Sequence, residues 1–170
     1  TLMVAELAEG RGRFIDHIIN GVFLFCEMTT WSPPAHLYIQ KVRSPFPDHS
    51  EDIIDISGAE TAAVLAWAYY FFHAEFDKHN KLISKRLYGE LERRILNNYI
   101  KDVGWWWLAE NYKPGMLVNN WNPWCNSNVL LCYMLLDGDK DRFAKAVYKS
   151  MRSVDKYLNY VNEDGACDEG

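Results

Sequence analysis

Apolar residues recur along this chain at spacings of three and four, and this periodicity restricts it to an all-α fold. Over residues 11–26 the pattern places one wide apolar stripe on a helix. Comparable patterns predict further helices at about 57–76, 81–99, 127–136 and 140–160. Stretches of alternating polar and apolar residues are too short to predict a significant sheet. The length of 170 residues indicates one domain, residues 1–170, with a sizeable core.

The connections between these helices alternate between short and long. Ser57 and Glu60 stand at the positions of a capping box at the start of the second helix. The polar residues 77–80 predict a short turn, and residues 137–139 predict a second one, in which Asp139 caps the last helix. Helices joined by short turns tend to run antiparallel, so the short turns should lie at one end of the assembly.

All the long connections, near 27–56, 99–126 and from 161 onward, then fall at the opposite end. They hold most of the unusual residues of the chain, including three consecutive tryptophans at 105–107. Consecutive side chains cannot all face one way, so at least one of these tryptophans should be structural. The topology therefore predicts that the unusual residues gather on one face, where functional loops on a helical scaffold are expected.

The segment 119–128, with the sequence NNWNPWCNSN, has the most distinctive composition in the chain. It holds five asparagines and two tryptophans and carries no charge. Aromatic faces beside neutral amide donors and acceptors are what a sugar-binding cleft requires. The candidate residues are Asn119, Asn120, Trp121, Asn122 and Trp124. The structural alternative is that the amides satisfy helix ends and that Trp124 packs against the next helix.

Two other loop segments supply candidates. Trp31 and His36 lie in a proline-stiffened loop, where they either line the cleft or have structural roles, Trp31 closing the end of the core and His36 capping a turn. Acidic residues near the end of the chain, among them Glu169, either bind a cation or form a solvated loop.

Composition and spacing exclude several classes of function. The net charge is −5 and no basic stripe is present, so nucleic acid is not an expected partner. No apolar run is long enough to span a membrane. The four cysteines lack the spacing of a metal site, so we expect no metal and no other cofactor. The chain starts without an initiator Met or a signal peptide, and we expect it to be a fragment of a larger protein.

Four segments together resemble the helical domain of the heparinase II/III-like polysaccharide lyases. They are CEMTTWSPPAH (Cys26–His36), ISGAETAAVLAWAYY (Ile56–Tyr70), NNWNPWCNSN (Asn119–Asn128) and DGACDEG (Asp164–Gly170). The resemblance covers most of the chain in the right order. It implies antiparallel helical hairpins forming part of an incomplete (α/α) toroid, followed in the full protein by a β-sandwich domain. It also implies a periplasmic or secreted protein.

The resemblance further implies cleavage of an acidic polysaccharide by β-elimination at a uronic acid. Asn120, and as second choice Asn119, match the segment that neutralises the uronate carboxylate in this family. The residues that would line the cleft and bind substrate are Trp31, His36, Trp121, Asn122, Trp124 and Glu169. The family's catalytic tyrosine and sheet-domain histidine would lie beyond Gly170, so we expect the chain alone to be inactive.

Two other classes of function stay open. A glycoside hydrolase on a similar toroid would need two carboxylates beside the scissile bond, for which Glu27, Asp168 and Glu169 are the candidates. A non-catalytic carbohydrate-binding module would bind saccharide without cleaving it. Lys41 and Arg43 are loop cations that could recognise sulfate.

Overall fold

The computed structural model describes residues 1–101 and 103–166, and within these residues it is helical with no strand, which confirms the all-α prediction. A π-helical turn (Glu92–Leu96) links α4 to α5, and two 3-10 turns lie at Pro34–Ile39 and Trp106–Leu108. The α-helices are α1 (Leu2–Glu9), α2 (Ile15–Glu27), α3 (Ile56–His79), α4 (Lys81–Leu91), α5 (Asn97–Tyr99), α6 (Trp121–Leu136) and α7 (Lys140–Tyr160).

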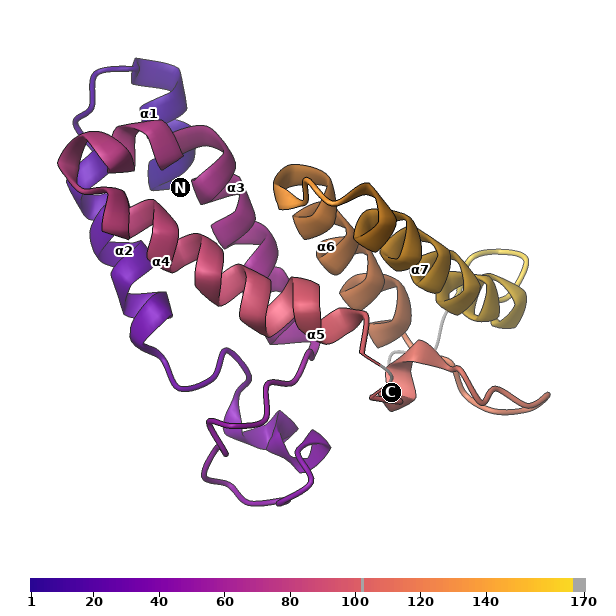
Figure 1. The fold of residues 1–170 in the computed structure, drawn as a ribbon. Coiled ribbons are helices and arrows are strands. Elements are labelled where there is room, and N and C mark those ends of the chain that lie inside the picture. The colour runs from indigo at the N-terminus through magenta and orange to yellow at the C-terminus, as the bar shows by residue number, and fades with distance from the viewer. Residues whose placement is uncertain (102, 167–170) are drawn as a thin grey trace.

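Two helical hairpins pack side by side. The first is α3 with α4, the second is α6 with α7, and the most extensive contact between them joins α3 to α6 (Figure 1). Helix α2 covers α3 and α4 on the far side of the first hairpin. The two hairpins therefore pack through their first helices. None of the described helices combines the length and apolarity needed to cross a membrane.

The alternation of connections is borne out by the arrangement of the helices. The short connections α3–α4 and α6–α7 lie on the upper side of Figure 1, and the long connections after α2 and α5 lie on the lower side. The first short connection is tighter than predicted. Helix α3 continues to His79, and Asn80 alone separates it from α4, whose first turn it caps by accepting a hydrogen bond from the Leu82 amide (2.9 Å).

Helix α3 begins at a different cap from the one predicted. Asp55 is the N-cap, and its Oδ1 accepts a hydrogen bond from the Gly58 amide (2.7 Å). Ser57 lies inside the first turn and Glu60 is exposed, so the capping-box prediction was wrong. A Cβ on Gly58 would lie 2.9 Å from Asp55 Oδ1, so the close carboxylate requires glycine there.

Helix α2 starts at Ile15, four residues later than predicted. The Glu6 carboxylate accepts hydrogen bonds from the backbone amides of Gly12 (2.6 Å) and Phe14 (2.9 Å). Gly12 adopts a positive φ of 75°, which a helix does not allow. This local network holds residues 10–14 as a turn between α1 and α2.

Helix α6 differs most from its prediction. It starts at Trp121 instead of Ser127, so most of the asparagine-rich segment is helical and not a loop. Pro123 is compatible with this start because proline is tolerated in the first turn of a helix, where its missing N–H has no intrahelical partner. The last helix matches its prediction at both ends, and Asp139 caps it by accepting from the amides of Asp141 (3.0 Å) and Arg142 (3.1 Å).

Candidate functional site

A histidine and a buried carboxylate form the polar centre of the candidate site. His36 lies in the 3-10 turn after α2, and its Nδ1 contacts Oδ2 of Asp55 at the start of α3. Asp55 is fully buried, and its Oδ1 also accepts from the hydroxyl of Ser32 (2.8 Å). With Nδ1–H donated to the carboxylate, the neutral ring keeps Nε2 as an acceptor. The pair therefore fixes both the orientation and the tautomer of His36.

Two tryptophans extend the site from this histidine. The ring of His36 meets Trp121 edge to face, with centroids 4.7 Å apart, and Trp121 contacts Trp106 at 5.0 Å. Trp106 is 46% exposed, whereas its neighbours Trp105 and Trp107 are buried and stack on each other. Trp107 also donates from Nε1 to the carbonyl of Ile54 (2.9 Å). The buried pair thus anchors the segment and presents Trp106 to solvent.

Trp106 lines two hollows. One, of about 340 Å³, is also lined by Tyr38, Lys41 and Arg43 from the connection after α2. The other, of about 270 Å³, is lined by residues between Gly104 and Met116, among them Trp105, Glu110 and Tyr112. The exposed indole therefore lines both hollows, and one of them also holds the cations Lys41 and Arg43 together with the carboxylate of Glu51.

Asn119 and Asn120 directly precede the aromatic pair. Asn120 is the N-cap residue of α6, and Asn119 accepts a hydrogen bond at Oδ1 from the Trp121 amide (3.1 Å). Both residues are partly exposed. They therefore lie beside Trp121 at the start of the helix.

The remaining asparagines of the segment have structural positions. Asn122 is fully buried, and its Nδ2 lies within hydrogen-bond distance of the Trp107 carbonyl (2.8 Å), the Ser153 carbonyl (3.2 Å) and Ser153 Oγ (2.9 Å). Asn126 donates to Ser153 Oγ (2.8 Å) and accepts from the hydroxyl of Tyr99. These amides tie α6 to α7 and to the tryptophan segment. The expectation that Asn122 contacts a substrate is contradicted, because solvent does not reach it.

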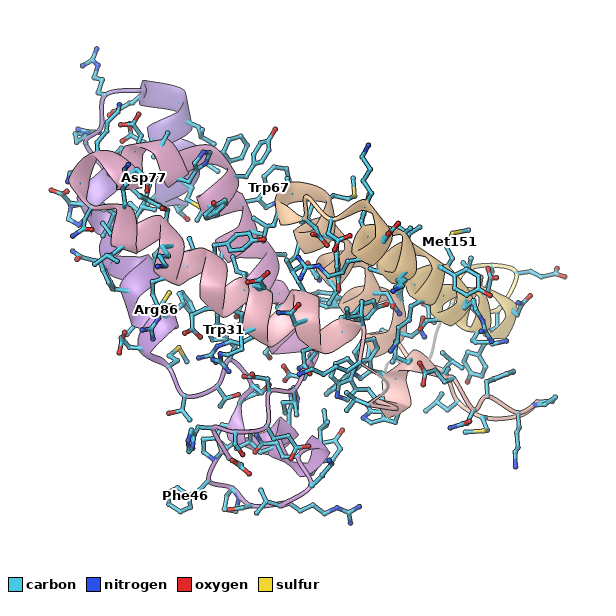
Figure 2. The ribbon with its side chains drawn as sticks, in the orientation of Figure 1. Trp31, Phe46, Trp67, Asp77, Arg86 and Met151 are labelled. Carbon is cyan, nitrogen blue, oxygen red and sulfur yellow. The ribbon has the colours of Figure 1, made fainter. Side chains whose placement is uncertain are left out.

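The two other predicted tryptophans lie outside this cluster. Trp31, which Figure 2 labels, is only 7% exposed. It donates from Nε1 to the carbonyl of Phe25 (2.9 Å) and packs under the guanidinium of Arg94. It closes the end of the core, the structural alternative stated above. Trp124 is half exposed in the first turn of α6 but lines neither hollow beside Trp106.

The carboxylates considered for a hydrolase are not gathered at this site. Glu27 is the last residue of α2, lies 3.5 Å from Arg86 and lines a separate groove between α2 and α4. Glu169 and Asp168 lie outside the described residues. Among the described residues, no group of three or more histidine, cysteine, aspartate or glutamate side chains is placed to hold a metal ion.

The three cysteines among the described residues belong to the core. Cys26, Cys125 and Cys132 are buried free thiols. Burial raises the pKa of Cys26 to about 11 and that of Cys132 to about 12, and it raises the pKa of Cys125 as well. These thiols stay protonated at neutral pH and are not nucleophiles.

Asp55 and Trp106 are the members of the site that the sequence analysis did not single out. Asp55 follows two buried isoleucines and precedes a helix, which is a recognisable N-cap position, but Ser57 offered a competing signal. Trp106 could not be separated from Trp105 and Trp107, because three adjacent indoles carry the same sequence signal.

Comparison with known proteins does not identify the chain. No protein-family model and no curated protein matches the chain.

Proposed function

We propose that this chain forms the helical part of a polysaccharide lyase that cleaves uronate-containing polysaccharide by β-elimination. The observation that carries the proposal is the chain of ring contacts from His36 to Trp121 and from Trp121 to Trp106, with Asn119 and Asn120 directly before Trp121. Aromatic faces suit the apolar faces of sugar rings, and the amides suit an acidic group on the same sugar. The resemblance to the heparinase II/III-like lyases supports the same reading, and it implies a periplasmic or secreted protein.

The chemistry of elimination explains why such residues would be useful. A base removes the C5 proton of the uronate, the electron pair forms the C4–C5 double bond, and the C4–O glycosidic bond breaks. The leaving oxygen is protonated by an acid. Negative charge that develops on the carboxylate must be stabilised by hydrogen-bond donors, which is the role assigned to Asn120 and Asn119.

His36 has the second polar role in the proposal. Its contact with the buried Asp55 holds the ring without movement at the moment of reaction, and its Nε2 can accept a hydrogen bond or exchange a proton. Asp55 acts as a positioning residue. Trp121 and Trp106 would stack against the sugars on either side of the cleaved bond.

The test measures unsaturated products in the full-length protein. Uronate polymers are incubated with the protein, and the ultraviolet absorbance of a conjugated unsaturated uronate is followed. We expect Asn120→Ala and His36→Ala to lower kcat/KM at least about a hundredfold, as loss of a transition-state hydrogen bond does. His49→Ala is the matched control, because His49 is an exposed histidine of the same connection.

Circular dichroism establishes that each variant is folded before its activity is compared. Release of saturated sugars alone would contradict the proposal and favour a hydrolase. Full activity in a folded His36→Ala and a folded Asn120→Ala variant would remove both residues from the mechanism. Saccharide binding without cleavage by the full-length protein would identify a binding module instead.

A further inference from the structure

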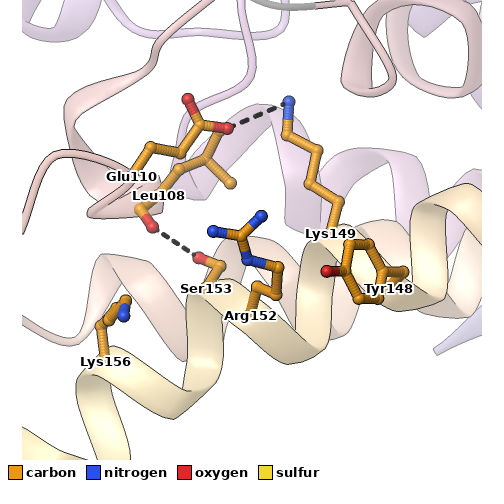
Figure 3. A pocket seen from close by; sticks show the side chains of 7 residues that line it. All are labelled: Leu108, Glu110, Tyr148, Lys149, Arg152, Ser153 and Lys156. Atoms are coloured by element: carbon orange, nitrogen blue, oxygen red, sulfur yellow. Dashed lines mark hydrogen bonds and ion pairs between the residues drawn. The ribbon is translucent and has the colours of Figure 1, made fainter.

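A second hollow lies away from the His36–Trp121 cluster, against the outer helix α7. Its volume is about 250 Å³, and Figure 3 shows the side chains that line it. The α7 residues come from less than three helical turns, and the segment that follows Trp107 closes the other side. The lining residues are Leu108, Glu110, Tyr148, Lys149, Arg152, Ser153 and Lys156.

Cations outnumber carboxylates in this hollow. Lys149, Arg152 and Lys156 recur at spacings of three and four, which places them on one face of α7. Glu110 is the one carboxylate among the lining residues, and it lies 3.5 Å from Lys149. The local balance is therefore three positive charges against one negative charge, in a chain whose net charge is −5.

The three cations differ in how firmly they are held. Lys149 is tied to the protein, because its Nζ donates to the Lys101 carbonyl (3.1 Å) and lies over the ring of Tyr99. Arg152 is exposed and Lys156 is partly exposed. The guanidinium of Arg152 lies 5.7 Å from the ring centroid of Tyr148, which is itself largely exposed. Arg152 and Lys156 are thus accessible to a ligand, and Lys149 contributes a fixed positive charge.

The wall of the hollow is ordered. Ser153 is buried and donates from Oγ to the Leu108 carbonyl (2.9 Å), as the dashed line in Figure 3 shows. The same Oγ accepts from Asn122 and Asn126. The cations therefore stand on a helix that is fixed to the tryptophan segment, so a ligand has to order their side chains but not the backbone.

We propose that this hollow binds an acidic group of a saccharide, with Arg152 and Lys156 holding the oxyanion and Tyr148 stacking on the sugar ring. A guanidinium binds a carboxylate or a sulfate in two-point fashion, and an exposed phenol ring suits a pyranose face. The assignment of the anion to a saccharide rests on the proposed function. The site would bind the polysaccharide at a distance from the cleavage centre and would favour chains that carry an acidic group at that position.

Binding of small probes to the protein tests this site without requiring catalysis. Inorganic sulfate, an unsulfated galacturonate trimer and a chondroitin sulfate disaccharide are titrated separately by calorimetry at low salt. We expect the double variant Arg152→Gln/Lys156→Gln to weaken binding of at least one saccharide about tenfold or more. Raising the salt should weaken wild-type binding strongly, since the contacts are exposed.

Lys140→Gln is the matched control, since it removes one positive charge from the same helix at its first residue, outside the hollow. Equal saccharide affinity in the folded double variant and the wild type would overturn the proposal. Binding of sulfate alone would also overturn it, because the ligand would then not be a saccharide. Binding of the galacturonate trimer would show that a carboxylate is sufficient, because this probe carries no sulfate.

The two proposals can fail separately. If the double variant loses saccharide binding while the full-length protein yields no unsaturated product, the site on α7 stands and the lyase proposal falls. If unsaturated product forms and saccharide affinity is unchanged in the double variant, the lyase proposal stands and the site on α7 falls.

Discussion

At the scale of single residues, burial decides what a side-chain amide does. Asn120 and Asn126 have the same donor and acceptor groups, and both belong to one short segment. Asn120 is partly exposed beside Trp121, whereas Asn126 is buried between α6 and α7. A buried amide must satisfy its groups within the protein, because leaving them unpaired costs about 1–3 kcal/mol each. The same residue type therefore serves a candidate site at one position and the core at another.

The buried amide network should be a measurable source of stability. Asn126→Ala removes a donor to Ser153 Oγ and the acceptor of the Tyr99 hydroxyl. We expect the free energy of unfolding to fall by about 2–4 kcal/mol in chemical denaturation. Asn128→Ala is the control, since its Nδ2 donates to the Trp124 carbonyl (2.9 Å) from a partly exposed position. Equal losses in the two variants would show that the network adds no stability.

At the scale of helices, the sequence was informative where one face is apolar and the other is polar. Helix α7 has this pattern with a strong Asp139 cap, and both of its ends were predicted correctly. Helix α6 places Asn122 and Asn126 on one face, toward Ser153 of α7. Polar residues on a buried face break the apolar period, and their partner lies on another helix. The early start of α6 could therefore not be read from local sequence.

The candidate site, too, could be predicted from the sequence only in part. The alternation of short and long connections predicted that the loop of His36 and the segment of Trp121 share one face, and the structure brings their rings into contact. The partner of His36 is Asp55, which lies 19 positions away and also competes with Ser57 as the helix cap. Such a pairing depends on how the whole connection folds, which spacing alone does not specify.

The end of α4 holds a charge cluster whose effect should depend on pH. Glu90 is buried and accepts from Arg93 (2.7 Å) and Arg94 (2.8 Å). Burial alone would raise its pKa, but the hydrogen bonds from Arg94 and Arg93 outweigh this and hold the pKa below the ordinary value of 4.5. The folded state thus binds a proton less readily than the unfolded state. Stability from Glu90 is present above about pH 5 and is lost as the pH falls through the lowered pKa.

Glu90→Gln should remove this contribution. We expect the free energy of unfolding to fall by about 2 kcal/mol at pH 7, and the difference from wild type to shrink toward pH 3. Thermal or denaturant unfolding at the two pH values measures both effects. Glu75→Gln is the control, because Glu75 pairs with Lys78 on an exposed face and should change stability by less than about 1 kcal/mol. A Glu90→Gln difference that does not depend on pH would contradict the assignment.

At the scale of the whole molecule, α3 joins the two hairpins. It packs against α2 and α4 on one side and against α6 on the other. Its buried positions include Ala59, Ala62 and Ala66, which are completely inaccessible. Small side chains let helix backbones approach closely, so the second hairpin can share one core with the first. The sequence of this helix is apolar on nearly every side, but α3 exposes Val64, which is 47% accessible. The neighbouring helices therefore cover most of the surface of α3, but not the side that carries Val64.

A shared core predicts that the two hairpins unfold together. Ala66→Leu inserts three carbons at a fully buried position, and we expect it to cost about 1–3 kcal/mol and to lower one common transition. Far-ultraviolet circular dichroism reports both hairpins, and fluorescence reports all seven tryptophans, among them Trp67 in the first hairpin and Trp121 in the second. Coincident transitions in wild type and variant would follow from the shared core, and Val64→Leu should leave them unchanged because that side chain is half exposed. Two separated transitions would mean that each hairpin is an independent folding unit, because the contact between α3 and α6 would then be too weak to couple them.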